Sequence, residues 1–157
     1  MIQRFAVDKM LGRLATWLRI IGQDATYGGH LSGQALVRHA RTEGRTILSR
    51  DGRLQGRHVN VPLLFIESDH FRDQLRQVIT AFHIDPVANA FTRCARCNQP
   101  LVPVDKAAVA RRVPPYVFAT QPAFVRCPRC KRIYWPATHH QRVLQEIAAL
   151  GLSVVPP

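Results

Sequence analysis

Acidic residues are scarce in this chain of 157 residues, which has 10 aspartates and glutamates against 22 lysines and arginines and a formal net charge of +12. The deficit is greatest in residues 91–157, which hold 10 basic residues and two acidic ones. Such an excess of positive charge favours polyanionic partners, and nucleic acid is the first candidate. A soluble protein that is merely basic would show the same balance.

Long apolar runs are also missing. No run approaches the roughly 18 to 20 residues of a membrane span, and charged residues interrupt the first twenty positions, where a signal peptide would need an apolar core. We therefore expect no membrane association and a cytoplasmic location. Hydrophobic residues still make up 46% of the chain, which argues against intrinsic disorder.

Proline and cysteine are nearly absent from the first 90 residues, which contain two of the 11 prolines and none of the four cysteines. This shift in composition predicts regular structure over residues 1–88 and a loop-rich unit over residues 91–137. Apolar residues at helical spacing predict a C-terminal helix and tail over residues 138–157. That helix is most simply a packing element.

The first unit alternates between strand and helix patterns. Strands are predicted over residues 2–7, 24–27, 46–49 and 59–66, and helices over residues 10–21, 32–42 and 69–82. Ser32 is a candidate N-cap of the second helix. This order predicts an α/β domain with a mainly parallel sheet.

Three of the few carboxylates follow predicted strands: Asp8, Asp51 and Asp69. Because the carboxyl ends of parallel strands line one edge of a sheet, these side chains could meet there. Clustered carboxylates need a cation, and their hard oxygen ligands suit Mg²⁺ or Mn²⁺, which can activate water for phosphodiester cleavage. Aspartate is also common after strands because it favours turns and helix N-caps, so Asp8 and Asp69 could instead cap helices.

The four cysteines form two Cys-x-x-Cys pairs, Cys94 with Cys97 and Cys127 with Cys130. Two thiolate pairs make a tetrahedral site that suits structural Zn²⁺, and an iron–sulfur cluster or a redox dithiol is the alternative. The intervening residues 98–126 need a hairpin or an inserted turn.

Basic and aromatic residues surround the cysteine pairs. Arg96 and Arg129 lie within them, and Tyr134 and Trp135 follow shortly after. This mixture is typical of a surface on which nucleic-acid bases stack. Trp135 could instead belong to the small core of this unit. The adjacent His139 and His140 are expected at the surface or at a helix start.

Several of these motifs, in this order, resemble one nuclease family. Residues 5–24 are similar to the opening of the PIN-like family named after the C-terminal RNase domain of the mutator-seven exonucleases, and residues 43–51 resemble its second signature. Residues 93–98, 113–114 and 127–135 resemble the zinc ribbon that many prokaryotic members carry. The similarity extends over roughly residues 3–145.

The resemblance implies a PIN-like fold followed by a zinc ribbon, and metal-dependent ribonuclease activity. It implies that Asp8 and Asp51 bind the metal and that Asp69 or Asp73 supplies a late carboxylate. The chain departs from the family at residues 30–36, where acidic residues are usual and Gln34 stands instead.

Arginines near the proposed site fit a substrate that carries phosphate. Arg13, Arg50 and Arg53 are candidates, because a guanidinium donates two parallel hydrogen bonds to phosphate oxygens. Exposed helix positions, or a pairing of Arg50 with Asp51 or Asp24, would explain them equally well.

We therefore expect a ribonuclease that uses Mg²⁺ or Mn²⁺, with a zinc ribbon that contacts RNA through residues such as Arg96 and Arg129. The alternative is a non-catalytic RNA-binding or adaptor protein with a degenerate site, which the missing acid near Gln34 favours. A DNA-binding regulator is a third possibility, although it leaves the first unit without a role.

Overall fold

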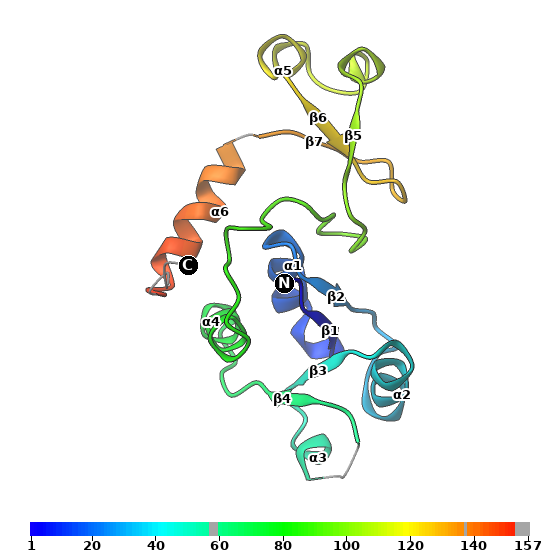
Figure 1. The fold of residues 1–157 in the computed structure, drawn as a ribbon, viewed down its shortest axis with the longest axis vertical. Helices are drawn as coiled ribbons and strands as arrows, with labels where there is room; N and C mark the ends of the chain where they lie inside the picture. Colours follow the sequence, from blue (N-terminus) through cyan, green and yellow to red (C-terminus); the bar gives the residue numbers. More distant parts are fainter. Residues whose placement is uncertain (57–59, 137, 153–157) are drawn as a thin grey trace.

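The computed structural model describes residues 1–56, 60–136 and 138–152. Its first sheet has four parallel strands in the order β2-β1-β3-β4 (Figure 1). The strands are β1 (Arg4–Val7), β2 (Asp24–Thr26), β3 (Thr46–Ser49) and β4 (Leu63–Phe65). The predicted α/β class with a mainly parallel sheet is confirmed.

Helices cover both faces of this sheet. They are η1 (Lys9–Leu11), α1 (Gly12–Ile20), α2 (Gly33–Glu43), α3 (Gly52–Gln55) and α4 (Phe71–Ala81). Successive strand side chains point to opposite faces, so Phe5 and Val7 pack with α1 and α4, whereas Ala6 packs with α2 and α3. The result is a three-layer arrangement with an apolar core on each side of the sheet.

A second, smaller sheet follows. Its strands β5 (Val102–Val104), β6 (Phe124–Arg126) and β7 (Ile133–Tyr134) are antiparallel and lie in that order. Between β5 and β6 the chain forms η2 (Lys106–Val109) and α5 (Pro115–Thr120), which is the predicted insertion between the cysteine pairs. Trp135 packs against the small core around Phe124, as one of the two predictions for it required.

The last helix, α6 (Thr138–Ala149), returns to the first unit along the side of the molecule on which α4 lies (Figure 1). Ile147 and Leu150 are buried in the larger core of the first sheet. Arg72 of α4 forms an ion pair of 2.8 Å with Glu146. The helix is a packing element, as expected, and it ties the end of the chain to α4. No helix among the described residues is both long and apolar enough to cross a lipid bilayer.

The sequence patterns misplaced some boundaries. The strand predicted over 59–66 is observed only over Leu63–Phe65, and residues 57–59 lie outside the described part of the chain. The short helix α3 was not predicted, because four residues show no periodicity. α4 begins at Phe71, with His70 rather than Asp69 at its N-cap position.

The predicted capping bonds also differ. Ser32 and Asp8 hold N-cap positions, but neither side chain makes a capping hydrogen bond. Asp51 does, because its carboxylate accepts the backbone N–H of Arg53 at the start of α3.

Candidate functional site

Asp8 and Asp51 lie at the same edge of the parallel sheet, where β1 and β3 end side by side. The backbone N–H of Asp8 continues the ladder by donating to the carbonyl of Leu48 at 3.0 Å. The Ser49 hydroxyl then joins the two aspartates, because it donates to Asp8 Oδ2 at 2.6 Å and accepts the Asp51 N–H at 2.9 Å. Sequence reasoning missed Ser49, since a serine at a strand end has no distinctive pattern.

Asp8 is a buried carboxylate with an unused oxygen. Only 1% of the residue is exposed. Its Oδ2 accepts the Ser49 hydroxyl, but its Oδ1 has no hydrogen-bond partner among the described residues. Leaving a buried polar atom unpaired costs about 1–3 kcal/mol, and more for a charged group. A bound cation would satisfy this oxygen, so the site fits a divalent metal.

Asp51 is less buried than Asp8. Its side chain is 14% exposed, and Arg53 contacts both carboxylate oxygens, at 3.0 Å and 3.1 Å. The Arg53 side chain is 83% exposed, so this pair is screened by solvent and contributes little to stability. Arg53 therefore neutralises the aspartate from outside without closing the site.

The other predicted carboxylates are more exposed to solvent. The side chain of Asp69 is 79% exposed, 3.6 Å from His70, and that of Asp73 is 48% exposed and paired with Arg76. Gln34 is exposed at the start of α2, whose first turn has no acidic residue. Among the described residues, the only group of three or more side chains arranged to hold a metal is the four cysteines. Roles for Asp69 and Asp73 stay predictions.

The arginines named from the sequence make different contacts. Arg50 donates to the carbonyl of Ile66 at 3.0 Å, and Asp24, one of the partners considered for it, pairs instead with Arg45 at 2.7 Å. Arg13 lies over the ring of Phe71, with its guanidinium carbon 3.7 Å from the ring centroid. Sequence reasoning missed Phe71, because its contact depends on how α1 packs against α4.

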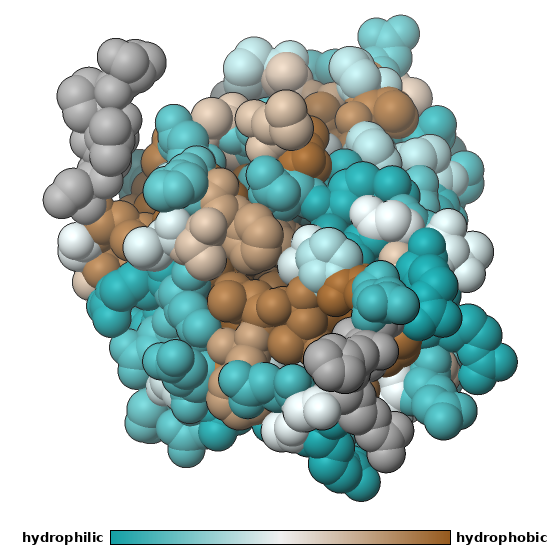
Figure 2. Space-filling model, turned by 60° about the horizontal axis from the view of Figure 1, so that its bottom comes forward, coloured by the Kyte–Doolittle hydropathy of each residue, from teal (hydrophilic) through white to brown (hydrophobic). Residues whose placement is uncertain are grey.

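The surface near the strand ends is mixed in character. On the side of the molecule where α3 lies, apolar side chains form a patch bordered by hydrophilic ones (Figure 2). Met10, two residues after Asp8, is 53% exposed.

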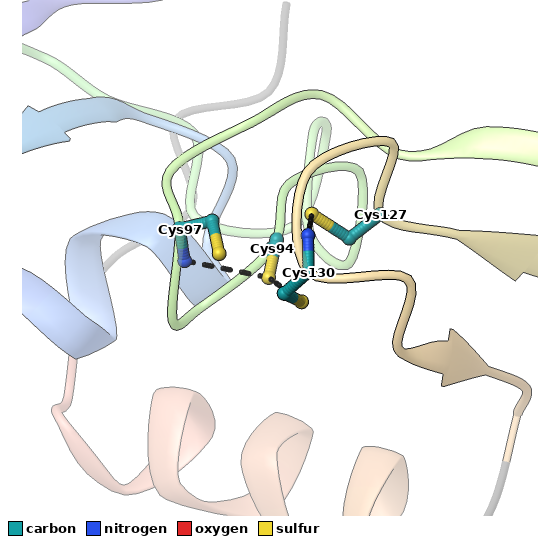
Figure 3. Close-up of side chains that lie close together, drawn as sticks. All are labelled: Cys94, Cys97, Cys127 and Cys130. Carbon is teal, nitrogen blue, oxygen red and sulfur yellow. Dashed lines mark hydrogen bonds between the residues drawn. The ribbon is translucent and has the colours of Figure 1, made fainter.

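The four cysteines converge on one point (Figure 3). Their sulfur atoms all lie within 4.8 Å of one another, and the Cys94 and Cys130 sulfurs are 3.9 Å apart. Zn–S bonds of about 2.3 Å in a tetrahedron place the sulfurs about 3.8 Å apart. The arrangement could hold a metal ion such as zinc.

Both cysteine pairs adopt the same backbone turn. In each, the N–H of the second cysteine points to the sulfur of the first at 3.4 Å. The residues that follow, Asn98 and Lys131, both have positive φ, 65° and 64°. Their backbone N–H groups donate to the carbonyl oxygens of Cys94 and Cys127, at 2.9 Å and 3.0 Å. We call these turns the first and second knuckles.

The surroundings of the Cys94 thiol favour its ionised form. Burial raises the pKa of Cys94, but hydrogen bonds from Tyr134 and from the backbone N–H of Cys97 and Arg96 outweigh burial and bring the pKa to about 7. The Tyr134 hydroxyl lies 3.1 Å from the Cys94 sulfur. A thiolate that forms near neutral pH is the species that binds zinc.

The first knuckle is bonded to the first sheet. Asn98 accepts the N–H of Ala25, on the edge strand β2, at 3.0 Å and donates to Asp24 at 2.7 Å. Arg19, only 7% exposed, donates to the carbonyls of Ala95 and Arg96 at 3.1 Å and 3.0 Å. Burial lowers the pKa of Arg19, although nearby negative groups oppose this. The first knuckle is thus attached to α1 and β2. The Arg96 and Arg129 side chains, named above as RNA contacts, are exposed.

The model of the Mut7-C RNAse domain matches residues 3–147. The chain belongs to this family. Comparisons with curated proteins and with solved structures gave no match. Membership of the Mut7-C RNAse domain family confirms the resemblance seen in the sequence and indicates a ribonuclease-type function, with RNA as the class of ligand.

Proposed function

We propose that this Mut7-C domain is a ribonuclease that hydrolyses RNA phosphodiester bonds with a divalent cation, Mg²⁺ or Mn²⁺, held at Asp8 and Asp51. The observation that carries the proposal is the Oδ1 of the buried Asp8, which has no hydrogen-bond partner in the part of the chain that the structure describes. The Ser49 hydroxyl links this carboxylate to the backbone N–H of Asp51, so two acidic residues lie at the same edge of the sheet and could share a cation.

The chain's own residues have distinct tasks in this proposal. Ser49 fixes the Asp8 carboxylate through a short hydrogen bond, which leaves Oδ1 directed away from that bond. When bound, a divalent cation lowers the pKa of the water that it binds and stabilises the leaving oxygen of the phosphodiester. Arg53 is exposed and can move from Asp51 to a phosphate oxygen when substrate arrives. Asp69, in the loop after β4, or Asp73, in the first turn of α4, is the proposed third carboxylate.

The four cysteines are proposed to hold a structural zinc, because closed sites with four cysteine ligands leave no position open for substrate. With zinc bound, the two knuckles would present Arg96 and Arg129 to RNA. Cytoplasmic location remains an expectation from the sequence.

A second candidate is an RNA-binding protein without nuclease activity. It is favoured because both oxygens of Asp51 accept hydrogen bonds from Arg53 and because the first turn of α2 carries no acidic residue. The two candidates differ in their dependence on divalent cations.

Cleavage of a labelled single-stranded RNA separates the two candidates. We expect cutting with added Mn²⁺ or Mg²⁺ by the wild-type protein and by Asp105→Asn, which removes an exposed carboxylate of the second unit. We expect none by Asp8→Asn or Asp51→Asn purified in the same way. RNA binding without cutting in any preparation would favour the second candidate.

A further inference from the structure

Two adjoining hollows lie beside the start of α6, one against the small sheet and the other against α5. One has a cavity volume of about 390 Å³ and the other of about 500 Å³, and Trp135, Pro136 and His140 line both. Volumes in this range are typical of pockets that hold small molecules. We call the two together the aromatic groove, because its walls include Phe91, Tyr116, Tyr134, Trp135, His139 and His140.

Planar rings in the groove pack against one another, one pair face to face and one pair at a steep angle. His140 stacks on Phe91, with ring centroids 3.7 Å apart and planes 11° from parallel. Trp135 meets Phe124 of the small core at an angle of 63° and a centroid distance of 6.1 Å. Tyr116 stands at the edge of the second hollow and is 78% exposed. The groove therefore combines a supported indole with an exposed phenol ring.

The charge around the groove is positive. Arg93 lines the first hollow, and residues 91–157 contain only two acidic residues, Asp105 and Glu146. Glu146 is paired with Arg72 of α4, and neither acidic residue lines either hollow. An anionic ligand with flat apolar faces fits this setting better than a neutral or cationic one.

We propose that the aromatic groove binds unpaired nucleobases of single-stranded RNA. Aromatic side chains bind bases by stacking and accept any base, because every base has a π-face, while nearby cations attract the backbone. The polar edges of the bases can remain in water, since the groove is open. The proposal rests on the proposed function for its choice of RNA as ligand, and it concerns a surface separate from Asp8 and Asp51.

Tryptophan fluorescence tests the groove directly. The chain has two tryptophans, and Trp17 stacks on Phe71 in the first unit, so Trp17→Phe leaves Trp135 as the only indole. Without added divalent cation, we expect an oligouridylate of eight nucleotides to quench this fluorescence. An abasic oligonucleotide of the same length and charge should not.

Variants of the exposed Tyr116 serve as matched controls. Tyr116→Leu keeps an apolar side chain but loses the ring, and we expect it to weaken oligouridylate binding, measured by fluorescence anisotropy, about five-fold or more. Tyr116→Phe keeps the ring and should bind as the wild type does. If RNA binds without quenching Trp135, or if the leucine variant binds equally well, the groove is not a nucleobase site, and an apolar segment of a protein partner becomes its expected occupant.

The outcome is independent of the nuclease test. Quenching without any RNA cleavage would support the groove and overturn the proposed activity. Metal-dependent cleavage without quenching would do the reverse.

Discussion

Replacing Asp8 by asparagine tests the cation site through stability alone. Asparagine keeps an oxygen that can accept the Ser49 hydroxyl, which lies 2.6 Å from Asp8 Oδ2, but it removes the negative charge. In the wild-type protein the Asp8 carboxylate is buried, and its Oδ1 has no hydrogen-bond partner within residues 1–56, 60–136 and 138–152. Without added metal, we therefore expect Asp8→Asn to be at least as stable as the wild type, which is unusual for a substitution in a core.

Added metal should make the wild type more stable than Asp8→Asn. A ligand at a free concentration 100 times its Kd stabilises the folded state by about 2.7 kcal/mol. For a chain of this size, each kcal/mol changes the Tm by about 2–4 °C, so saturating Mn²⁺ should raise the wild-type Tm by about 5–11 °C. Asp8→Asn should gain little, because its remaining ligands are too few.

Thermal denaturation of the zinc-loaded protein with increasing Mn²⁺ measures both effects. Asp105→Asn controls for general effects of salt, because it removes an exposed carboxylate of the second unit. Equal shifts in Tm for all three proteins, or none in the wild type, would refute the assignment of a cation to Asp8. A large loss of stability in metal-free Asp8→Asn would show that the carboxylate is structural.

Three further predictions concern the rest of the molecule. Cys127→Ser or zinc chelation should make residues 91–135 sensitive to protease, because ligand binding drives the folding of such sites; unchanged resistance after complete zinc removal would contradict this. Burial raises the pKa of Asp24, but hydrogen bonds from Arg45 and Asn98 outweigh it and hold the pKa below its usual value. The stability that Asp24 contributes should thus be present above about pH 4 and be lost as the pH falls further. The free energies of unfolding in urea of wild type and Asp24→Asn should therefore converge in acid. A difference that stays constant with pH would contradict this. Phe71→Leu removes the ring under the Arg13 guanidinium, a contact of about 0.5–1 kcal/mol, and should weaken RNA binding two- to five-fold, whereas an equal loss in the ring-preserving Phe71→Tyr would argue against a positioning role.

The pairing of Asp8 with Asp51 could be anticipated because it follows from topology. Asp8 directly follows β1 and Asp51 follows β3 after one residue, and parallel strands bring their carboxyl ends to one edge. The cysteine site could be predicted from the sequence equally well, since two Cys-x-x-Cys pairs suffice to define four ligands. In both cases the chemistry is set by spacing along the chain.

Contacts that depend on how helices pack could not be anticipated. Arg13 and Phe71 meet only because α1 lies beside α4, and His140 meets Phe91 only because α6 turns back toward the first unit. Asp24 was considered as a partner of Arg50, but burial of Arg45 beside it gives the stronger pair. No periodicity in the sequence encodes these encounters.

The central claim is that Asp8 and Asp51 hold a divalent cation with which the protein cleaves RNA. The most direct measurement is cleavage of a labelled single-stranded RNA, with Mn²⁺, with Mg²⁺ and without added metal, by wild type, Asp8→Asn, Asp51→Asn and Asp105→Asn purified in parallel. The account predicts metal-dependent cutting by wild type and Asp105→Asn alone. Cutting of equal rate in all four proteins, or in none, would contradict it.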